Sequence, residues 1–94
     1  MIEKKFKEKI KLLLDSKSLT ENKVRIVEEF GELSKEILKD IRGQINTPNL
    51  LEEFADVVIE LHMLKEIYNI SNDTLEKAIT KKMDKNMKRL EHKP

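Results

Sequence analysis

Two stretches of the sequence match each other: Val27-Glu28-Glu29-Phe30-Gly31-Glu32-Leu33 and, 24 residues later, Leu51-Glu52-Glu53-Phe54-Ala55-Asp56-Val57. Both place apolar residues three and four positions apart, which is the spacing of one face of an α-helix. Both also carry acids at positions i, i+3 and i+7 beside the apolar seam, namely Glu29, Glu32 and Glu36, and Glu53, Asp56 and Glu60. The repeat therefore predicts two amphipathic helices whose acidic sides face each other if the helices pack antiparallel.

The sequence on either side of this repeat predicts four helices in all. They are expected from Ile2 to Asp15, from the capping box at residues 18–21 to about Asp40, from Pro48 to Tyr68, and from a second capping box at residues 73–76 to about Leu90. Gly43 indicates the end of the second predicted helix, and Thr47 is expected to cap the start of the third. Since no segment has the alternation of a strand, we expect an all-α antiparallel four-helix bundle in a single domain over residues 1–94.

The predicted inward faces follow from the same spacing. They comprise Ile2, Phe6, Ile10, Leu13 and Leu14; Ile26, Phe30, Leu33 and Ile37; Leu50, Phe54, Val57, Leu61, Leu64 and Tyr68; and Leu75, Ile79 and Leu90. Gly31 and Ala55 lie between paired acids, where small side chains are expected to let the two middle helices approach closely.

Composition excludes several classes of protein. With 94 residues, no Cys and two Gly, the chain is too short for a separate cofactor domain and lacks disulfides, thiolate metal sites and a glycine-rich phosphate loop. Any bound phosphate must therefore be held by side chains and metal. No apolar run reaches membrane-spanning length and the N-terminus does not resemble a signal peptide, so we expect a cytoplasmic protein with no membrane contact.

Charge is distributed unevenly along the chain. Residues 28–60 carry nine acidic and three basic side chains, whereas residues 1–25 and 77–94 are net basic. Such a pattern suits a centre that binds cations and edges that bind anions. It is equally what ordinary solvated helix faces produce, so charge alone does not decide between these readings.

The four central acids Glu29, Glu32, Glu53 and Asp56 indicate a metal centre. Converging carboxylates raise one another's pKa or require a cation. Oxygen ligands suit Mg²⁺, Mn²⁺ or Ca²⁺ rather than zinc. Iron is disfavoured because di-iron bundles need Glu-x-x-His, which neither His62 nor His92 provides. The alternative is that the acids only solvate two surface helices.

A polar line runs along the apolar side of the last helix. Lys82, Asn86 and Arg89 are spaced i, i+4 and i+7, so they share one face. Cationic and amide groups of this kind hold phosphate oxygens. The alternative is an inward stripe of Met83, Met87 and Leu90 that leaves Lys82 in solvent.

Together these segments resemble a known family. Residues 28–32 and 53–56 are similar to the Glu-Glu-x-x-Glu and Glu-x-x-Asp signature of the MazG-like all-α nucleoside triphosphate pyrophosphohydrolases. Residues 82–89 resemble the family's Lys-x-x-x-Asn-x-x-Arg segment, especially in the dCTP pyrophosphatase branch. The resemblance covers about residues 20–90, with the three motifs in the expected order.

The resemblance implies an enzyme that cleaves a (d)NTP between its α and β phosphates to give (d)NMP and pyrophosphate. It makes Glu29, Glu32, Glu53 and Asp56 the ligands of Mg²⁺, with Mn²⁺ as a substitute, and Lys82, Asn86 and Arg89 the phosphate contacts. Glu28, Glu36 and Glu60 are candidates for positioning the attacking water or a metal ligand. Family members form dimers or tetramers, so a homo-oligomer is expected.

Three other functions fit parts of the sequence. The same fold could act on phosphoribosyl-ATP. A noncatalytic helical module could bind nucleic acid or an acidic partner through its basic ends, although neither end interleaves aromatic residues, so we expect no nucleic-acid partner. A purely structural bundle would bind no metal at all.

Overall fold

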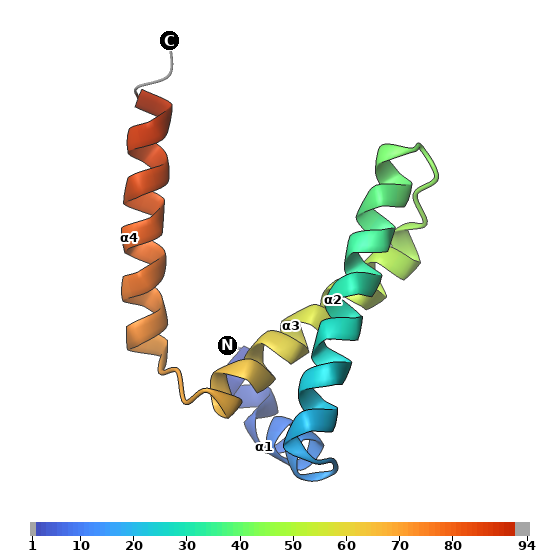
Figure 1. Ribbon diagram of the computed structural model, residues 1–94, viewed down its shortest axis with the longest axis vertical. Coiled ribbons are helices and arrows are strands. Elements are labelled where there is room, and N and C mark those ends of the chain that lie inside the picture. Colours follow the sequence, from blue (N-terminus) through green and yellow to red (C-terminus); the bar gives the residue numbers. More distant parts are fainter. Residues whose placement is uncertain (1, 92–94) are drawn as a thin grey trace. The chain divides into compact units, whose positions relative to one another are not determined.

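The computed structural model describes residues 2–91, and only the backbone of Ile2 and Glu3. Within that range it contains four α-helices and no strand: α1 (Ile2–Asp15), α2 (Leu19–Ile41), α3 (Thr47–Ile67) and α4 (Asn72–Glu91) (Figure 1). The predicted all-α class with four helices is confirmed, and every helix end lies close to its predicted place. The antiparallel order of the whole bundle remains a prediction. None of the helices in residues 2–91 has the length and apolarity needed to cross a bilayer.

The chain divides into two compact units. The first ends at Leu64 and holds α1, α2 and most of α3; the second begins at Lys65 and holds the end of α3 and all of α4. The single domain predicted over residues 1–94 stays a prediction.

The start of α2 is fixed by side-chain caps. The Glu21 backbone N–H donates to Ser18 Oγ at 3.1 Å and the Ser18 N–H donates to Glu21 Oε1 at 3.3 Å, which is the predicted capping box. These bonds lower the pKa of Glu21. One turn on, the buried Asn22 side chain donates to the carbonyl of Leu14 at 2.9 Å. This bond ties α1 to α2, and it was not predicted from the sequence.

The turn between α2 and α3 begins as predicted. Gly43 has a φ of +75°, and the N–H groups of Gly43 and Gln44 donate to the carbonyls of Asp40 and Lys39 at 2.9 and 2.8 Å. This is the glycine-terminated helix end that a residue with a Cβ adopts only with strain.

Two predicted caps are wrong by one or two residues. Asn46 rather than Thr47 caps α3, since Asn46 Oδ1 accepts the Asn49 N–H at 3.2 Å and Thr47 is already helical. The capping box at residues 73–76 does not cap α4 either, because Ser71 Oγ accepts the Thr74 N–H at 3.1 Å and the helix has begun by Asn72. In both places a good capping residue stands slightly earlier than the one predicted.

Few apolar side chains are buried. Among the described residues the buried apolar ones are Ile10, Ile26 and Met63, and Ile26 is the most completely buried of the three. On α3 the predicted seam is wrong in part, because Phe54 and Leu61 are 58% and 50% exposed while Glu60 and Met63 are buried. The buried face of α3 is therefore rotated from the predicted seam toward the acidic side, while Leu50, Val57 and Leu64 stay half-buried. The predicted place of Ile2 lies outside the described side chains.

The predicted role of Gly31 and Ala55 is also wrong. Both are exposed, and a Cβ built at Gly31 meets nothing within 4 Å. A residue two positions after an inward-facing acid points to the opposite side of a helix, which is why neither small residue lies between α2 and α3.

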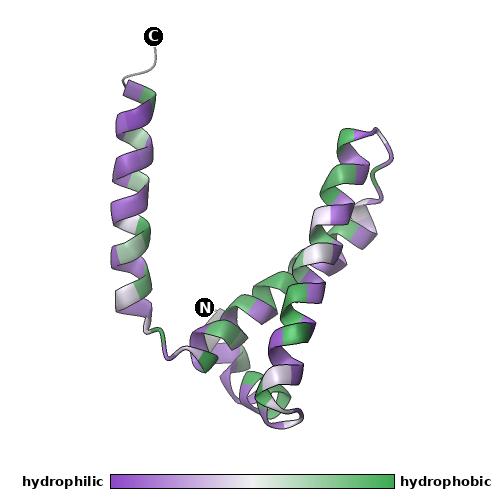
Figure 2. Ribbon diagram, viewed as in Figure 1, coloured by the Kyte–Doolittle hydropathy of each residue, from purple (hydrophilic) through white to green (hydrophobic). Residues whose placement is uncertain are grey.

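Apolar side chains instead line the sides of α2 and α3 that point away from the buried positions. Figure 2 shows hydrophobic and hydrophilic residues interspersed along both helices. We call six of the exposed apolar residues the outer apolar stripes: Val24, Val27 and Leu38 on α2, and Leu51, Phe54 and Leu61 on α3.

Candidate metal centre

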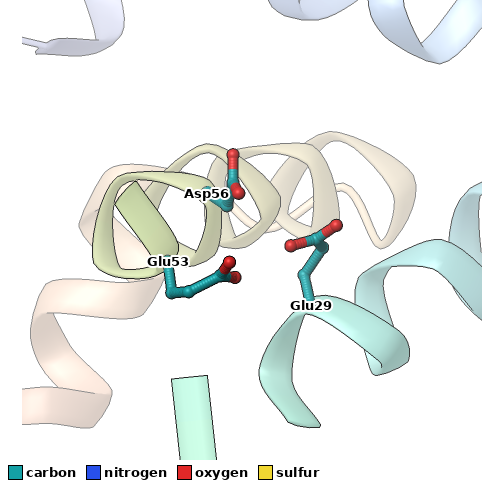
Figure 3. Close-up of side chains that lie close together, drawn as sticks. All are labelled: Glu29, Glu53 and Asp56. Carbon is teal, nitrogen blue, oxygen red and sulfur yellow. The ribbon is translucent and has the colours of Figure 1, made fainter. Parts of the chain in front are cut away.

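Three carboxylates from two helices converge between α2 and α3. Glu29 comes from α2, and Glu53 and Asp56 come from adjacent turns of α3. Each offers one oxygen, and these oxygens all lie within 4.8 Å of one another (Figure 3). All three residues are half-buried. We call Glu29, Glu53 and Asp56 the acidic triad.

Glu53 shows the electrostatic cost of this convergence. Burial raises the pKa of Glu53, and the negative charges of Glu29, Asp56 and Glu32 and a hydrogen bond with Glu29 raise it further. Its Oε2 is buried and has no hydrogen-bond partner among the described residues. A carboxylate in this setting is stabilised by gaining a proton or a cation.

Glu32, the fourth predicted ligand, lies at the edge of the triad. It is exposed, and its Oε1 is 3.5 Å from Lys35 Nζ. Its charge nevertheless acts on Glu53. The packing of α2 against α3, which we call the α2–α3 hairpin, therefore brings three of the four predicted ligands together. Glu32 lies close by and pairs with a lysine on its own helix.

The three glutamates predicted to position water or a ligand differ in burial. Glu28 is exposed. Glu36 is 8% exposed, and its Oε1 accepts a hydrogen bond from Lys39 Nζ at 3.2 Å. Glu60 is 4% exposed. Glu36 and Glu60 each keep a buried Oε2 without a hydrogen-bond partner among the described residues.

Positive charge reaches the triad from within α2. Arg25 Nη2 lies 3.9 Å from Glu29 Oε1, an i,i+4 pair on the helix surface. Burial raises the pKa of Glu60, and the negative charges of Glu29 and Asp56 raise it further. The positive charge of Arg25 lowers this pKa. Arg25 was missed as part of the site, although its spacing from Glu29 is visible in the sequence.

The predicted phosphate contacts lie in the other compact unit. Lys82, Asn86 and Arg89 are exposed on α4. The alternative apolar stripe is exposed as well, with Met83 and Met87 at 53% and 52%. The exposures therefore do not favour one inward face of α4 over the other, and the phosphate role remains a prediction.

The acidic triad fits a hard divalent cation. It is the one group of three or more His, Cys, Asp or Glu side chains in the described residues whose ligand atoms come this close together. Its donors are all oxygens, which Mg²⁺ and Mn²⁺ prefer. Two oxygens on opposite sides of one Mg²⁺ are about 4 Å apart, so small side-chain movements would bring the triad to bonding distance.

No protein-family model matches this chain, and neither a curated protein nor a solved structure is significantly similar to it. The resemblance to the MazG-like enzymes therefore depends on the three motifs alone.

Proposed function

We propose that the protein is a Mg²⁺-dependent nucleoside triphosphate pyrophosphohydrolase. The observation that carries the proposal is the acidic triad, in which oxygens from two helices lie within 4.8 Å and one buried oxygen of Glu53 has no partner among the described residues. Such a group stays ionised at neutral pH most easily with a cation beside it. The motif resemblance supplies the bond that is cut.

In this proposal each part of the chain has a defined task. Glu29, Glu53 and Asp56 hold Mg²⁺, or Mn²⁺ in its place, and Glu32 joins them if it leaves Lys35. The bound metal neutralises phosphate oxygens and makes water more acidic. Lys82, Asn86 and Arg89 hold the phosphates of the (d)NTP by charge and hydrogen bonding. No nucleophilic side chain is needed, because water attacks directly.

The outer apolar stripes support the predicted homo-oligomer. Apolar side chains that recur on one side of a helix are typical of surfaces that another apolar surface covers, and we propose a second copy of the chain as that surface. A dimer or tetramer would bury them, and light scattering coupled to size-exclusion chromatography measures which assembly forms.

The proposal is tested by a phosphate-release screen on a panel of NTPs and dNTPs. With Mg²⁺ present, we expect a colorimetric phosphate signal only when inorganic pyrophosphatase is added, because the enzyme itself releases pyrophosphate. The product nucleotide should be the monophosphate by chromatography. Orthophosphate as the first product would contradict the assigned bond cleavage.

Two further arms of the screen separate the alternative functions. Phosphoribosyl-ATP in the panel distinguishes that substrate from the free triphosphates. A noncatalytic module would give no product with any compound, and its binding to nucleic acid would weaken steeply with salt and ignore Mg²⁺.

A further inference from the structure

Glu60 is a buried acid whose negative charge is offset in part by the positive charges of Arg25 and Lys17. It is 4% exposed, and its Oε2 has no hydrogen-bond partner among the described residues. A buried carboxylate oxygen raises the free energy of the folded state unless a donor or a cation meets it. Something that donates a hydrogen bond, such as a bound water, would satisfy Oε2.

The helix places Glu60 beside the acidic triad. It follows Asp56 by one turn and Glu53 by two turns on the same face of α3. Glu29 and Asp56 act on Glu60 electrostatically, whereas Glu32 acts on Glu53. Glu60 therefore lies at the Glu29–Asp56 end of the triad, and Glu32 lies at the Glu53 end.

Glu60 follows the acidic triad along α3 without belonging to it, because it is absent from the set whose oxygens lie within 4.8 Å of one another. Mg²⁺ binds oxygen at about 2.1 Å and keeps several waters, each of which can donate a hydrogen bond of about 2.8 Å. A carboxylate one turn beyond the triad would be placed to accept a hydrogen bond from a water of a cation held there.

We infer that Glu60 is a positioning residue of this centre, whose buried Oε2 accepts a hydrogen bond from a water held at the Glu29–Asp56 end of the triad. Glu36 also keeps a buried Oε2 without a described partner, but its Oε1 pairs with Lys39. It stands one turn beyond Glu32, at the other end of the triad from Glu60. Glu28 is exposed. The role of that water as the attacking nucleophile rests on the proposed function. Its role in holding the cation does not.

The first test is Mn²⁺ binding without substrate, measured by isothermal titration calorimetry and by the EPR signal of free Mn²⁺. Glu60→Gln keeps the shape of the side chain and weakens the acceptor. We expect it to reduce Mn²⁺ affinity about tenfold, the usual effect of losing a group that supports a metal ligand. The control Glu52→Gln, which changes an exposed glutamate on the same helix, should stay within about twofold of the wild type. Unchanged affinity in Glu60→Gln, or an equal loss in both variants, would overturn the inference.

The second test separates positioning from support of the fold. At saturating Mn²⁺, Glu60→Gln should lower kcat by about 10- to 100-fold and leave KM within about threefold. A raised KM with unchanged kcat would overturn the assigned role. Helix content by circular dichroism should match the wild type in every variant.

The outcomes distinguish this inference from the proposed function. If the wild type binds Mn²⁺ but cleaves no nucleotide, the proposed function fails and Glu60 is judged by the Mn²⁺ affinities alone. If the wild type binds no Mn²⁺, the inference fails as well.

Discussion

Two faces of the α2–α3 hairpin differ in an unusual way. The face between the helices combines the apolar Ile26 and Met63 with the acids Glu36 and Glu60, all of them buried. The opposite faces carry the outer apolar stripes, with Leu51 at 68% and Phe54 at 58% exposure. In an ordinary helical hairpin the apolar side is buried and the charged side is in solvent.

Within the first compact unit, each face has a requirement that this unit does not meet by itself. Buried carboxylate oxygens need a cation, a proton or a donor. Exposed apolar stripes need another apolar surface. Each requirement can be tested separately, because the inner acids and the outer apolar residues occupy different positions on the same two helices.

The largest expected effect comes from the inner face. Glu53→Gln should reduce Mg²⁺-dependent nucleotide cleavage by about 10³-fold or more, because it removes a charged ligand from the centre. The neighbouring Glu52 is exposed, so Glu52→Gln is the matched control and should retain activity. Similar activities of the two variants in the pyrophosphate assay would show that the inner acids do not act as ligands.

The outer face should control assembly. Phe54→Asp places a charge in an apolar stripe, and we expect it to weaken the self-association constant by about 10- to 100-fold, because one large apolar side chain contributes about 1.5–3 kcal/mol when buried. Sedimentation velocity measures the shift. Glu52→Lys changes charge nearby without removing apolar surface and should leave assembly intact. A wild-type chain that is monomeric at high concentration would contradict the interpretation that self-association covers the outer apolar stripes.

A smaller effect is expected at the entry to the hairpin. Ser18→Ala removes the hydroxyl that accepts the Glu21 N–H at 3.1 Å. Loss of such a cap should lower the free energy of unfolding by about 1 kcal/mol, measured by urea denaturation. Ser34→Ala, on the exposed side of the same helix, is the control and should change stability less. An equal loss in both variants would mean that the capping box is not the cause.

The smallest effect concerns pH in the absence of metal. The folded state raises the pKa of Glu53 above its ordinary value of 4.5, so the folded state holds this proton more tightly than the unfolded chain. Its contribution to stability is present below that value and is lost as the pH rises through the raised pKa. Glu53→Gln should therefore match the wild type near pH 4 and melt at a higher temperature at pH 7.

Two observations would show that this interpretation of Glu53 is wrong. Without metal, the melting temperatures of wild type and Glu53→Gln would then run parallel across the pH range. Added Mg²⁺ would also fail to stabilise the wild type more than the variant, although a ligand that binds only the folded state must stabilise it.

The sequence predicted the helices well because their signals are local. The Ser18–Glu21 capping box and Gly43 act through backbone groups within a few residues, and both are confirmed. The misplaced caps at Thr47 and Asp73 show the limit of this reasoning, since Asn46 and Ser71 offered equally good side chains slightly earlier.

The rotation of α3 was not predictable by the same means. Phe54 and Leu61 form a regular apolar stripe, and hydrophobic spacing alone assigns that stripe to the core. The structure turns Glu53, Asp56 and Glu60 inward instead. The convergence of three acids was foreseen because the repeat places them at matching positions. The separate environments of Glu32 and Glu60 depend on packing that a single sequence does not contain.

The most direct test is the anomalous scattering of Mn²⁺ in crystals grown with the metal. We expect a peak at about 2.2 Å from carboxylate oxygens of both Glu29 on α2 and Glu53 or Asp56 on α3. A well-ordered crystal with Mn²⁺ bound elsewhere, and with these three side chains separated and in contact only with solvent, would contradict it.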